Sequence, residues 1–278
     1  LRNVGRCAST PRQIAAVASK AYQYDPTSRR VTQAKTHGGS QTYSIVYTES
    51  GFADGYNSWQ LRSEATLPDG STKIVYANHI SQDMLVDNIQ GSNRWINYVR
   101  FEDNSPEGDP PVPGNHSKAV GRVTHRYSPS AIDMSGTPYD DSEPTLEVQL
   151  NDNKGLVQIT TYYADNQTAP GYLEYQQVRQ GTAGSPIKLR KVEYESHTVG
   201  SGANVATVYP VTKQIVYRSD ASGGSDPVET TFTNEFYTGK TQRKKVTTHL
   251  PDVEAGQNGG AWLTGNTQIQ EFDVQGRL

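Results

Sequence analysis

Short runs in which apolar and polar residues alternate, each ended by Gly, Pro, Asn or Asp, recur through most of the sequence. Alternation places every second side chain on the same face of an extended strand, whereas a helix needs a period of about 3.6 residues. Because no long amphipathic run separates these segments, the pattern predicts an all-β fold made of antiparallel hairpins. The predicted strands are residues 42–49, 59–67, 72–78, 94–102, 121–128, 145–152, 156–164, 172–180, 187–196, 212–220, 230–238 and 244–250.

Two of the connections have the residues of a tight hairpin. Asp69-Gly70 and Asn153-Lys154-Gly155 each separate two alternating runs, and Asn, Asp and Gly tolerate the positive φ of such turns. We therefore predict a hairpin at both. Longer clusters of Pro, Gly and Asp cannot continue a strand ladder, so they are predicted to be surface loops. These clusters are residues 102–118, 134–144, 219–227 and 251–260.

An aromatic residue closes many of the alternating runs and is followed by polar or turn residues. Neighbouring members of this series lie about 19 to 36 residues apart, the range expected of a solenoid or repeat array. We therefore expect a repeated hairpin unit with a loose period. The series is Tyr24, Tyr47, Tyr76, Phe101, Tyr127, Tyr163, Tyr194, Tyr217, Phe236 and Phe272.

Composition and charge exclude several classes of partner. The chain is poor in aliphatic residues but has 17 Tyr, so we expect ordered strands around a thin core. A net charge of -3 offers no basic stripe for phosphates, which argues against nucleic-acid binding. The basic run at 240–245 is interpreted as a solvated strand face or turn. No apolar run approaches the ~20 residues that a membrane helix requires, so no membrane span is predicted.

The chain is divided into a lead-in, residues 1–21, and a strand-rich segment, residues 22–278. Around Pro11, a capping pattern and a first-turn proline predict one short helix from Pro11 to Ser19. The single cysteine, Cys7, excludes an internal disulfide framework. No secretory leader is visible. We expect the chain to be a fragment of a longer repeat array, with any address signal outside it.

The sequence contains no arrangement typical of an active site. It has no Gly-x-Ser-x-Gly nucleophile elbow, and its histidines lack the spacing of a zinc site. Calcium could be held by the oxygen-rich stretches 150–155 and 102–109, but neither matches an EF-hand loop, and we interpret both as turns. We therefore predict no catalytic, cofactor-binding or metal-binding residue. Four carboxylates could each be proposed for glycoside hydrolysis, and they are Glu147, Glu174, Glu193 and Asp165. None of them differs from the ordinary charged residues on a strand face.

Two stretches share a motif. "YQYDPTSRRV" at 22–31 and "QEFDVQGRL" at 270–278 resemble the YD repeat of the RHS (rearrangement hotspot) family, which reads approximately Tyr-x-Tyr-Asp, a few residues, then Gly-Arg-Leu. Val31 stands at the leucine position of the first copy, and Arg29 stands at its glycine position. The residues predicted to be structural parts of the motif are Tyr22, Tyr24, Asp25 and Arg30 in the first copy, and Phe272, Asp273, Gly276 and Arg277 in the second.

Each motif residue has a physical role in a hairpin. Tyrosines at strand ends can stack on neighbouring hairpins, each pair adding about 0.5–1.5 kcal/mol beyond area burial. The aspartate is expected to shape the turn, and the arginine one turn later to bond it. Glycine supplies the positive φ that such a turn needs, so Arg29 in its place predicts a longer or differently shaped first turn.

The resemblance implies a fold and a role. In the family, such repeats wind into a β-sheet ribbon that spirals around a large hollow shell, enclosing a toxic or variable C-terminal domain or displaying a surface module. By resemblance, the chain is a non-enzymatic wall or scaffold segment in an extended, curved, solenoid-like sheet of a secreted or cell-surface protein. Its partners would be neighbouring repeats of the same longer chain, and an enclosed domain or a cell-surface glycan. It lacks a recognisable autocleavage region.

Two other functions stay open. The tyrosine excess and the tryptophans Trp59, Trp95 and Trp262 could form a carbohydrate- or cell-surface-binding module, because aromatic rings can bind sugars. A glycan-active enzyme on a β-scaffold is the more remote alternative. Because the segment ends within a motif, we also expect an exposed edge strand and a tendency to self-associate.

Overall fold

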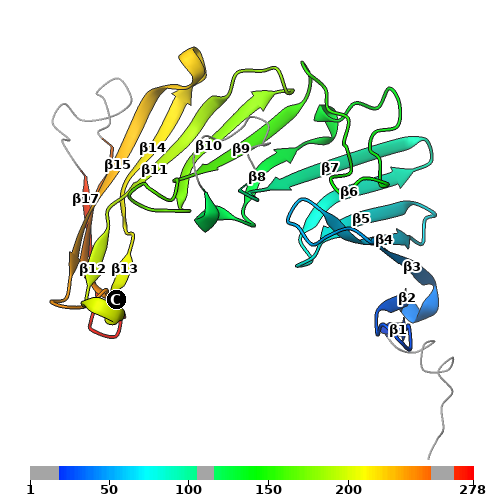
Figure 1. The fold of residues 1–278 in the computed structure, drawn as a ribbon, viewed down its shortest axis with the longest axis horizontal. Helices are drawn as coiled ribbons and strands as arrows, with labels where there is room; N and C mark the ends of the chain where they lie inside the picture. The colour runs from blue at the N-terminus through cyan, green and yellow to red at the C-terminus, as the bar shows by residue number, and fades with distance from the viewer. Residues whose placement is uncertain (1–18, 105–115, 252–265) are drawn as a thin grey trace, which may run out of the picture. The chain divides into compact units, whose positions relative to one another are not determined.

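The protein is all-β in its described residues, as the alternation predicts. The structure, a computed structural model, describes residues 19–104, 116–251 and 266–278, and these contain β-strands, five short 3₁₀ turns and no α-helix (Figure 1). The helix predicted from Pro11 to Ser19 lies outside the described residues except for its last residue, as does much of the loops predicted at 102–118 and 251–260.

The chain forms two compact units. The first comprises Leu1–Val99 with Met134–Gln149, and the second comprises Arg100–Asp133 with Leu150–Leu278. The strands of the first unit are β1 (Lys20–Tyr24), β2 (Val31–Thr36), β3 (Gln41–Glu49), β4 (Trp59–Thr66), β5 (Thr72–Asn78), β6 (Asp83–Gln90) and β7 (Asn93–Phe101), and the last two residues of β7 are counted with the second unit. Those of the second are β8 (Val123–Tyr127), β9 (Leu156–Tyr162), β10 (Leu173–Gln180), β11 (Ile187–Tyr194), β12 (His197–Val199), β13 (Ala206–Val208), β14 (Val211–Ser219), β15 (Ser225–Phe236), β16 (Arg243–His249) and β17 (Thr267–Glu271).

The 3₁₀ turns lie in connections between strands. They are η1 (His37–Gly39), η2 (Ser117–Ala119), η3 (Pro129–Ala131), η4 (Gly202–Asn204) and η5 (Ala221–Gly223).

In the first unit each strand pairs antiparallel with the strand before it, from β1 to β7. The hairpin predicted at Asp69-Gly70 is confirmed: the Leu67 N–H donates to the Ser71 carbonyl over 2.8 Å, and Gly70 has φ +82°. One sheet face is buried. Ile74, Asp87 and Ile96 are directly opposite one another on β5, β6 and β7 and therefore share that face.

Segment 134–149 covers this buried face of β4 to β7, and we call it the cover segment. The Trp59 N–H donates to the Pro144 carbonyl over 3.0 Å, and the Tyr98 hydroxyl donates to the Thr145 carbonyl over 3.2 Å. Leu146 is fully buried. Buried backbone groups need hydrogen-bond partners, and these bonds supply them where the segment meets the sheet.

The strand predicted at 145–152 is wrong, because this run belongs mostly to the cover segment. Leu146 and Glu147 both have positive φ, which interrupts an extended strand. Only Leu150 pairs with another extended residue, in an isolated bridge to Ile132. Leu146 is buried in this segment without being part of a strand, so the contact with the sheet decides the backbone conformation and the local alternation does not.

The hairpin predicted at Asn153-Lys154-Gly155 is therefore also wrong. Strand β9, which follows it, pairs instead with β8 and β10. Gly155 has φ +78°, and a Cβ atom there would lie 2.1 Å from the Ala131 nitrogen. Glycine is required because the backbone of the loop passes close to the 3₁₀ turn η3.

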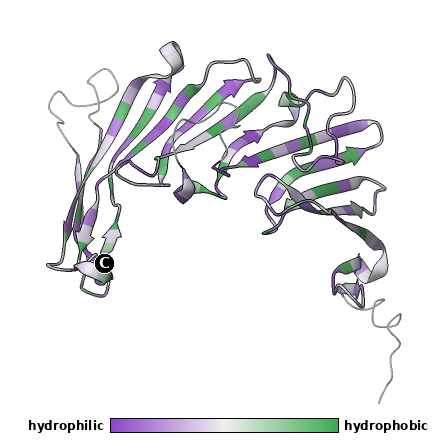
Figure 2. Ribbon diagram, viewed as in Figure 1, coloured by the Kyte–Doolittle hydropathy of each residue, from purple (hydrophilic) through white to green (hydrophobic). Residues whose placement is uncertain are grey.

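The other predicted runs all coincide with strands, and Figure 2 shows hydrophilic and hydrophobic residues alternating along them. Strand β6 was not predicted because Met84, Leu85 and Val86 are consecutive apolar residues, which breaks the alternation. The short strands β1, β2, β12, β13 and β17 are also absent from the predicted set.

The second unit contains a ladder in the order β8, β9, β10, β11, β14, β15, β16 and β17, and β12 pairs with β13 in a separate hairpin. Its buried residues gather at β8, β9 and the loops around them, with Tyr127, Ile132 and Val157 fully enclosed. From β11 to β17, the buried apolar residues of the described chain are Val192, Ile215 and Val246. Here cross-strand and same-strand ion pairs follow the sheet: Lys191–Glu193, Lys213–Glu229 and Lys245–Glu235.

Candidate functional site

The first motif copy forms the turn between β1 and β2. The Asp25 N–H donates to the Arg30 carbonyl over 2.8 Å, and the Arg29 N–H donates to the Asp25 carbonyl over 3.0 Å. The Asp25 carboxylate accepts from the N–H groups of Thr27 and Ser28 at 3.0 and 2.6 Å. The backbone hydrogen bond from Ser28 lowers the pKa of Asp25, because it stabilises the ionised form.

The second motif copy forms a turn after β17 by the same bonds. The Asp273 N–H donates to the Arg277 carbonyl, and the Gly276 N–H donates to the Asp273 carbonyl, both over 2.9 Å. The Asp273 carboxylate accepts from the N–H groups of Gln275 and Arg277. The hydrogen bond from the backbone N–H of Arg277 lowers the pKa of Asp273 most, and the hydrogen bond from the Arg277 side chain lowers it further.

The glycine position has the same backbone conformation in both copies. Arg29 has φ +60° and Gly276 has φ +85°. The first turn is one residue longer, since Asp25 closes on Arg30 five residues later, whereas Asp273 closes on Arg277 four residues later. Arg29 thus accompanies a longer turn, as expected from the sequence, but it keeps the left-handed conformation despite its side chain.

The two motif arginines differ in their partners. Arg277 donates to the Asp273 carboxylate over 2.7 Å, so the aspartate and arginine of the second copy are brought together. Arg30 instead donates to Glu49 on β3 over 2.8 Å, and its guanidinium lies 5.4 Å from the centre of the Tyr47 ring. In the first copy the arginine therefore bonds the turn to β3.

A tyrosine hydroxyl supports each motif hairpin from a neighbouring segment, a contact that the sequence did not reveal. Tyr47 donates to the carbonyl of Val31 over 3.1 Å, and Tyr237 donates to the carbonyl of Phe272 over 2.7 Å. Val31 follows the first turn and Phe272 precedes the second. Tyr237 could have been found from its place directly after the aromatic that ends β15.

The motif aromatics themselves are exposed in the first copy. Tyr22 and Tyr24 are 50% and 58% exposed, and their ring centroids lie 6.4 Å apart on the same strand. Among the described residues, the ring contact of each is with the other and not with an aromatic ring of a neighbouring hairpin. Aromatic contacts between hairpins occur in the second unit, where Tyr194 packs edge-to-face on Tyr163 and Tyr172 at 5.9 and 5.2 Å.

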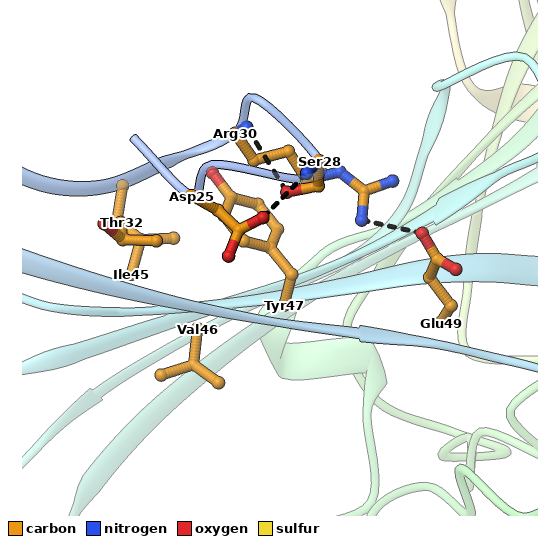
Figure 3. A pocket seen from close by; sticks show the side chains of 8 residues that line it. All are labelled: Asp25, Ser28, Arg30, Thr32, Ile45, Val46, Tyr47 and Glu49. Atoms are coloured by element: carbon orange, nitrogen blue, oxygen red, sulfur yellow. Dashed lines mark hydrogen bonds and ion pairs between the residues drawn. The ribbon is translucent and has the colours of Figure 1, made fainter. Parts of the chain in front are cut away.

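A shallow, open pocket of about 500 Å³ lies beside the first motif turn (Figure 3). Its polar groups are already used to hold the hairpin, since Arg30 bonds Glu49 and Asp25 bonds the turn backbone. Its lining residues are Asp25, Ser28, Arg30, Thr32, Ile45, Val46, Tyr47 and Glu49.

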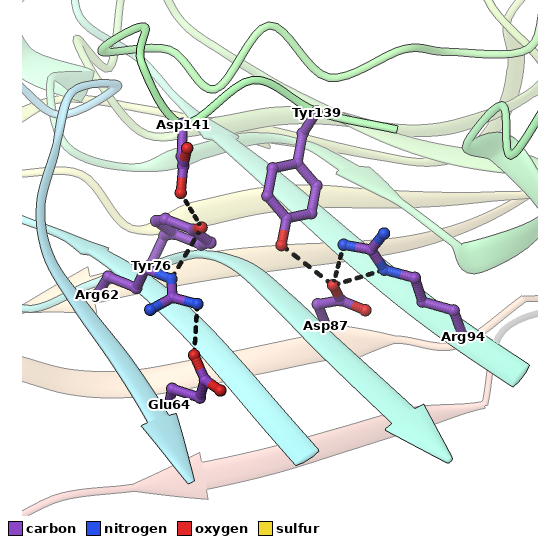
Figure 4. A network of polar contacts seen from close by, with 7 residues as sticks. All are labelled: Arg62, Glu64, Tyr76, Asp87, Arg94, Tyr139 and Asp141. Carbon is purple, nitrogen blue, oxygen red and sulfur yellow. Dashed lines mark hydrogen bonds and ion pairs between the residues drawn. The ribbon is translucent and has the colours of Figure 1, made fainter. Parts of the chain in front are cut away.

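A second polar cluster joins the cover segment to the sheet through two tyrosine–aspartate bonds of opposite direction (Figure 4). Tyr76 of the sheet donates to Asp141 of the cover segment over 2.8 Å, whereas Tyr139 of the cover segment donates to Asp87 of the sheet over 3.1 Å. The two rings meet edge-to-face at 5.5 Å. We call this arrangement the reciprocal clasp.

Each half of the reciprocal clasp contains an arginine. Arg62 donates to the Tyr76 hydroxyl over 3.1 Å and pairs with Glu64. Arg94 pairs with the fully buried Asp87 at 2.5 Å, and its guanidinium lies 5.1 Å from the centre of the Tyr139 ring. All three bonds to Asp87 reach one carboxylate oxygen, and the other, Oδ1, is buried without a hydrogen-bond partner among the described residues.

Burial raises the pKa of both clasp tyrosines above the ordinary value. Bonding to Asp141 adds to the upward shift at Tyr76, because a nearby carboxylate disfavours a phenolate. Both phenols therefore stay protonated and act as hydrogen-bond donors. This chemistry holds two polypeptide segments together, and it lacks a group positioned to attack a substrate.

The four carboxylates considered for glycoside hydrolysis lie in different environments. Asp165 accepts from the Ser117 hydroxyl and from the Lys118 N–H, and the Ser117 hydrogen bond lowers its pKa. Glu193 pairs with Lys191 at 2.8 Å. Burial raises the pKa of Glu174. Glu147 is exposed and has positive φ in the cover segment.

The tryptophans fall in different environments. Trp59 is buried between Phe52 and Tyr76, with ring centroids 5.6 and 5.3 Å away, so it cannot offer a flat face to a sugar. Trp95 on β7 is 44% exposed. Trp262 lies outside the described residues.

The first oxygen-rich stretch considered for calcium is occupied by internal bonds. The Asn151 amide donates to the Ser130 and Ile132 carbonyls, and Asp152 accepts from Thr182 at 2.7 Å. Across residues 19–104, 116–251 and 266–278, no three His, Cys, Asp or Glu side chains gather as a metal site. The second stretch, 102–109, lies partly outside the described residues.

The sequence matches no protein-family model and no curated protein. In the part of the chain that the structure describes, no helix is long and apolar enough to cross a membrane.

Proposed function

We propose that the chain is a non-enzymatic structural segment of an RHS/YD-repeat protein. In this role its hairpins form part of a β-sheet wall or scaffold, which encloses or displays another domain of a secreted or cell-surface protein. Its partners are the neighbouring repeats of the same longer chain.

The observation that carries the proposal is the common geometry of the two motif turns. Asp25 and Asp273 lie in different units, yet each closes its turn through its own N–H and carbonyl and binds two further N–H groups with its carboxylate. Each hairpin also receives a tyrosine hydroxyl from a neighbouring segment. A turn that recurs with the same pattern of hydrogen bonds is typical of a repeat unit.

The strand order also supports a structural role. Each strand of the two ladders pairs with its neighbours in the chain, apart from the inserted β12–β13 hairpin. In a quasi-one-dimensional array, each repeat contacts mainly the repeats beside it. In the pocket beside the first motif turn, the Arg30 and Asp25 side chains are bonded to Glu49 and to the turn backbone.

Hydrogen exchange on a shortened chain tests the array. We expect a chain that ends at Pro251, and so lacks β17 and the second motif turn, to lose protection in β15 and β16 alone. Protection in β4 to β7 stays unchanged, because these strands have no contact with the removed repeat in an array. Loss of protection throughout the chain contradicts the proposal, since it indicates one cooperative globular domain.

A glycan array separates scaffolding from carbohydrate binding. The scaffold role predicts no retained glycan. Binding that is lost in Trp95→Ala, but kept in a control at the buried-face position Trp59→Phe, favours the carbohydrate-binding alternative instead. Glycan hydrolysis abolished by Glu174→Gln points to the glycan-active alternative.

A further inference from the structure

Four tyrosine rings form a continuous series of contacts in the second unit, and we call them the tyrosine cluster. Its members are Tyr163, Tyr172, Tyr194 and Tyr209. The ring centroid of Tyr194 lies 5.9 Å from that of Tyr163 and 5.2 Å from that of Tyr172. Tyr172 also contacts Tyr209, with ring centroids 5.2 Å apart and ring planes inclined at 59°. The cluster thus joins the connection between β9 and β10 to the segment that leads from β13 into β14.

The backbone fixes Tyr172 at one end of this contact. Its N–H donates to the Ala169 carbonyl over 3.0 Å, and its carbonyl accepts from the Tyr163 N–H over 2.9 Å. Gly171 has φ +77°, and a Cβ atom there would lie 2.4 Å from the Lys118 carbonyl oxygen, so the approach requires glycine. Tyr172 is therefore held in place although it is 37% exposed.

Tyr209 is fixed from the other side, through the residues that follow it. The Glu195 N–H donates to the Pro210 carbonyl over 3.1 Å, and Tyr194 is opposite Val211 in the ladder of β11 and β14. The rings of Tyr172 and Tyr209 are thus neighbours before any reaction occurs. A reaction between them is intramolecular, and fixed neighbours react much faster than groups that must first meet by diffusion.

The hydroxyl groups of the cluster differ in their surroundings. Tyr163 donates to the Val192 carbonyl over 3.0 Å, and burial raises the pKa of both Tyr163 and Tyr194. Across residues 19–104, 116–251 and 266–278, the hydroxyls of Tyr172 and Tyr209 form no hydrogen bond to another residue. Oxidation of a phenol releases its proton, and a buried hydroxyl releases it less readily. Tyr172 and Tyr209 are therefore the members best placed to react.

We propose that Tyr172 and Tyr209 are a cross-linking site, which a haem peroxidase with hydrogen peroxide converts into dityrosine. Each phenol gives up one electron to the oxidant and one proton to water. The two phenoxyl radicals form one bond between the ring carbons beside their oxygens, and the hydrogens on these carbons then move to the oxygens to restore both phenols. The two electrons and two protons lost by the pair reduce one hydrogen peroxide to two waters.

The cross-link has a mechanical consequence. It closes a loop from residue 172 to residue 209, which contains β10, β11 and the β12–β13 hairpin. Closing a loop stabilises a fold by restricting the unfolded chain, as a disulfide does. The sequence has a single cysteine, so a disulfide within it cannot serve this purpose, whereas it has 17 Tyr.

Peptide mapping of the oxidised chain tests the site. The 278-residue chain is treated at low concentration with a haem peroxidase and hydrogen peroxide, then digested with trypsin and analysed by mass spectrometry. We expect dityrosine fluorescence, and peptide 155–179 joined to peptide 192–213 with the loss of two hydrogens. The oxidised chain should also have a higher Tm than the untreated chain. In urea the preference for this pair of peptides should disappear, because the rings are no longer held together.

Three phenylalanine variants identify the pair, because phenylalanine keeps the ring but lacks the hydroxyl that is oxidised. Tyr172→Phe and Tyr209→Phe should each abolish the joined peptides and the rise in Tm, whereas Tyr194→Phe should keep both. Circular dichroism checks that each variant is folded. A link that persists in Tyr209→Phe but is lost in Tyr194→Phe overturns the assignment.

Tyr22 and Tyr24 provide a comparison within the same sample. They are more exposed than Tyr172, and their ring centroids lie farther apart, at 6.4 Å. If fixed ring contact directs the reaction, the link between peptides 155–179 and 192–213 exceeds any link within peptide 21–29, which contains both Tyr22 and Tyr24. The reverse order, or no link between the two longer peptides, shows that exposure alone decides and overturns the proposal.

Discussion

The sheet face of β4 to β7 and the strands β14 to β17 are built from similar alternating sequence but are stabilised in opposite ways. The first has a cover segment, a buried core and the reciprocal clasp with the fully buried Asp87. The second has few buried apolar residues, and its Lys and Glu side chains pair across an open face. Burial thus carries the stability of one region, whereas turns and the backbone ladder carry that of the other.

This difference teaches which residues should matter in each region. Removal of the partner of a buried charge, or truncation of a buried side chain, lowers the free energy of unfolding strongly, because no new contacts replace the lost ones. Removal of one partner of an exposed ion pair lowers the free energy of unfolding little, since water solvates the group that remains. Equivalent substitutions in the two regions should therefore differ in effect.

The largest difference is expected for aspartate. Asp87→Ala should lower the free energy of unfolding by about 3–5 kcal/mol, because it leaves Arg94 and the Tyr139 hydroxyl without their carboxylate. Asp226→Ala, which removes the exposed partner of Arg218, should cost less than about 1 kcal/mol. Urea unfolding measures both, and equal losses contradict the comparison.

Leucine gives a test without charge. Leu146→Ala in the cover segment should cost about 2–4 kcal/mol, because the side chain is fully buried and a cavity remains. Leu189→Ala on β11, at a side chain 43% exposed, should change stability by less than about 1 kcal/mol. Thermal unfolding of the two variants checks the prediction. A similar fall in Tm for both variants contradicts it.

Tyrosine hydroxyls should show a smaller difference. Tyr76→Phe removes the donor to Asp141 and the acceptor from Arg62, and should cost about 2 kcal/mol because both lost partners are charged. Tyr237→Phe removes one bond to a neutral carbonyl and should cost about 1 kcal/mol. Denaturant midpoints distinguish them, and a larger loss for Tyr237→Phe reverses the expected order.

The motif aspartates should have similar, local effects in both units. Asp273→Ala and Asp25→Ala each remove the acceptor of two N–H groups at a turn, so each should lower the Tm slightly and by a similar amount. Hydrogen exchange should increase only at the strands next to each turn. An effect that spreads to β5 or β6 in either variant contradicts the local role of the motif.

The smallest effect concerns pH. The pKa values of Asp25 and Asp273 are lowered in the fold, so each group contributes stability above the unfolded value of 3.8 and loses it as the pH falls through the folded pKa. Tm measured from about pH 5 to about pH 2 should fall less steeply in Asp25→Asn/Asp273→Asn than in the unchanged chain. An identical slope shows that neither aspartate contributes.

The sequence predicts the fold well where side chains alternate and badly where tertiary contacts decide. The Asp69-Gly70 hairpin follows from local chemistry alone. The cover segment could not be predicted, because the run 145–152 alternates like a strand, whereas Leu146 is buried in a segment that packs on strands distant in the sequence. Strand β6 was missed for the converse reason: the neighbouring Met84 and Leu85 are both buried although they point to opposite faces of the sheet, so the apolar residues do not alternate.

The motif turns could be located from sequence, but their partners could not. Asp273 and Arg277 are four residues apart, and their bond follows from the turn itself. Arg30 pairs with Glu49 on another strand, and no local pattern indicates that choice. The reciprocal clasp likewise joins residues more than 50 positions apart, such as Asp87 and Tyr139, so spacing gives no sign of it.

The order of the strands has a kinetic consequence. Because almost every strand pairs with its predecessor in the chain, loop closure is short, and hairpins can form one after another as the chain emerges from the ribosome. The cover segment is the exception, since it must return to strands synthesised about 50 residues earlier. Closure of the cover segment over β4 to β7 is therefore expected to be the slow step in folding, and until then the buried face of β4 to β7 is open to aggregation.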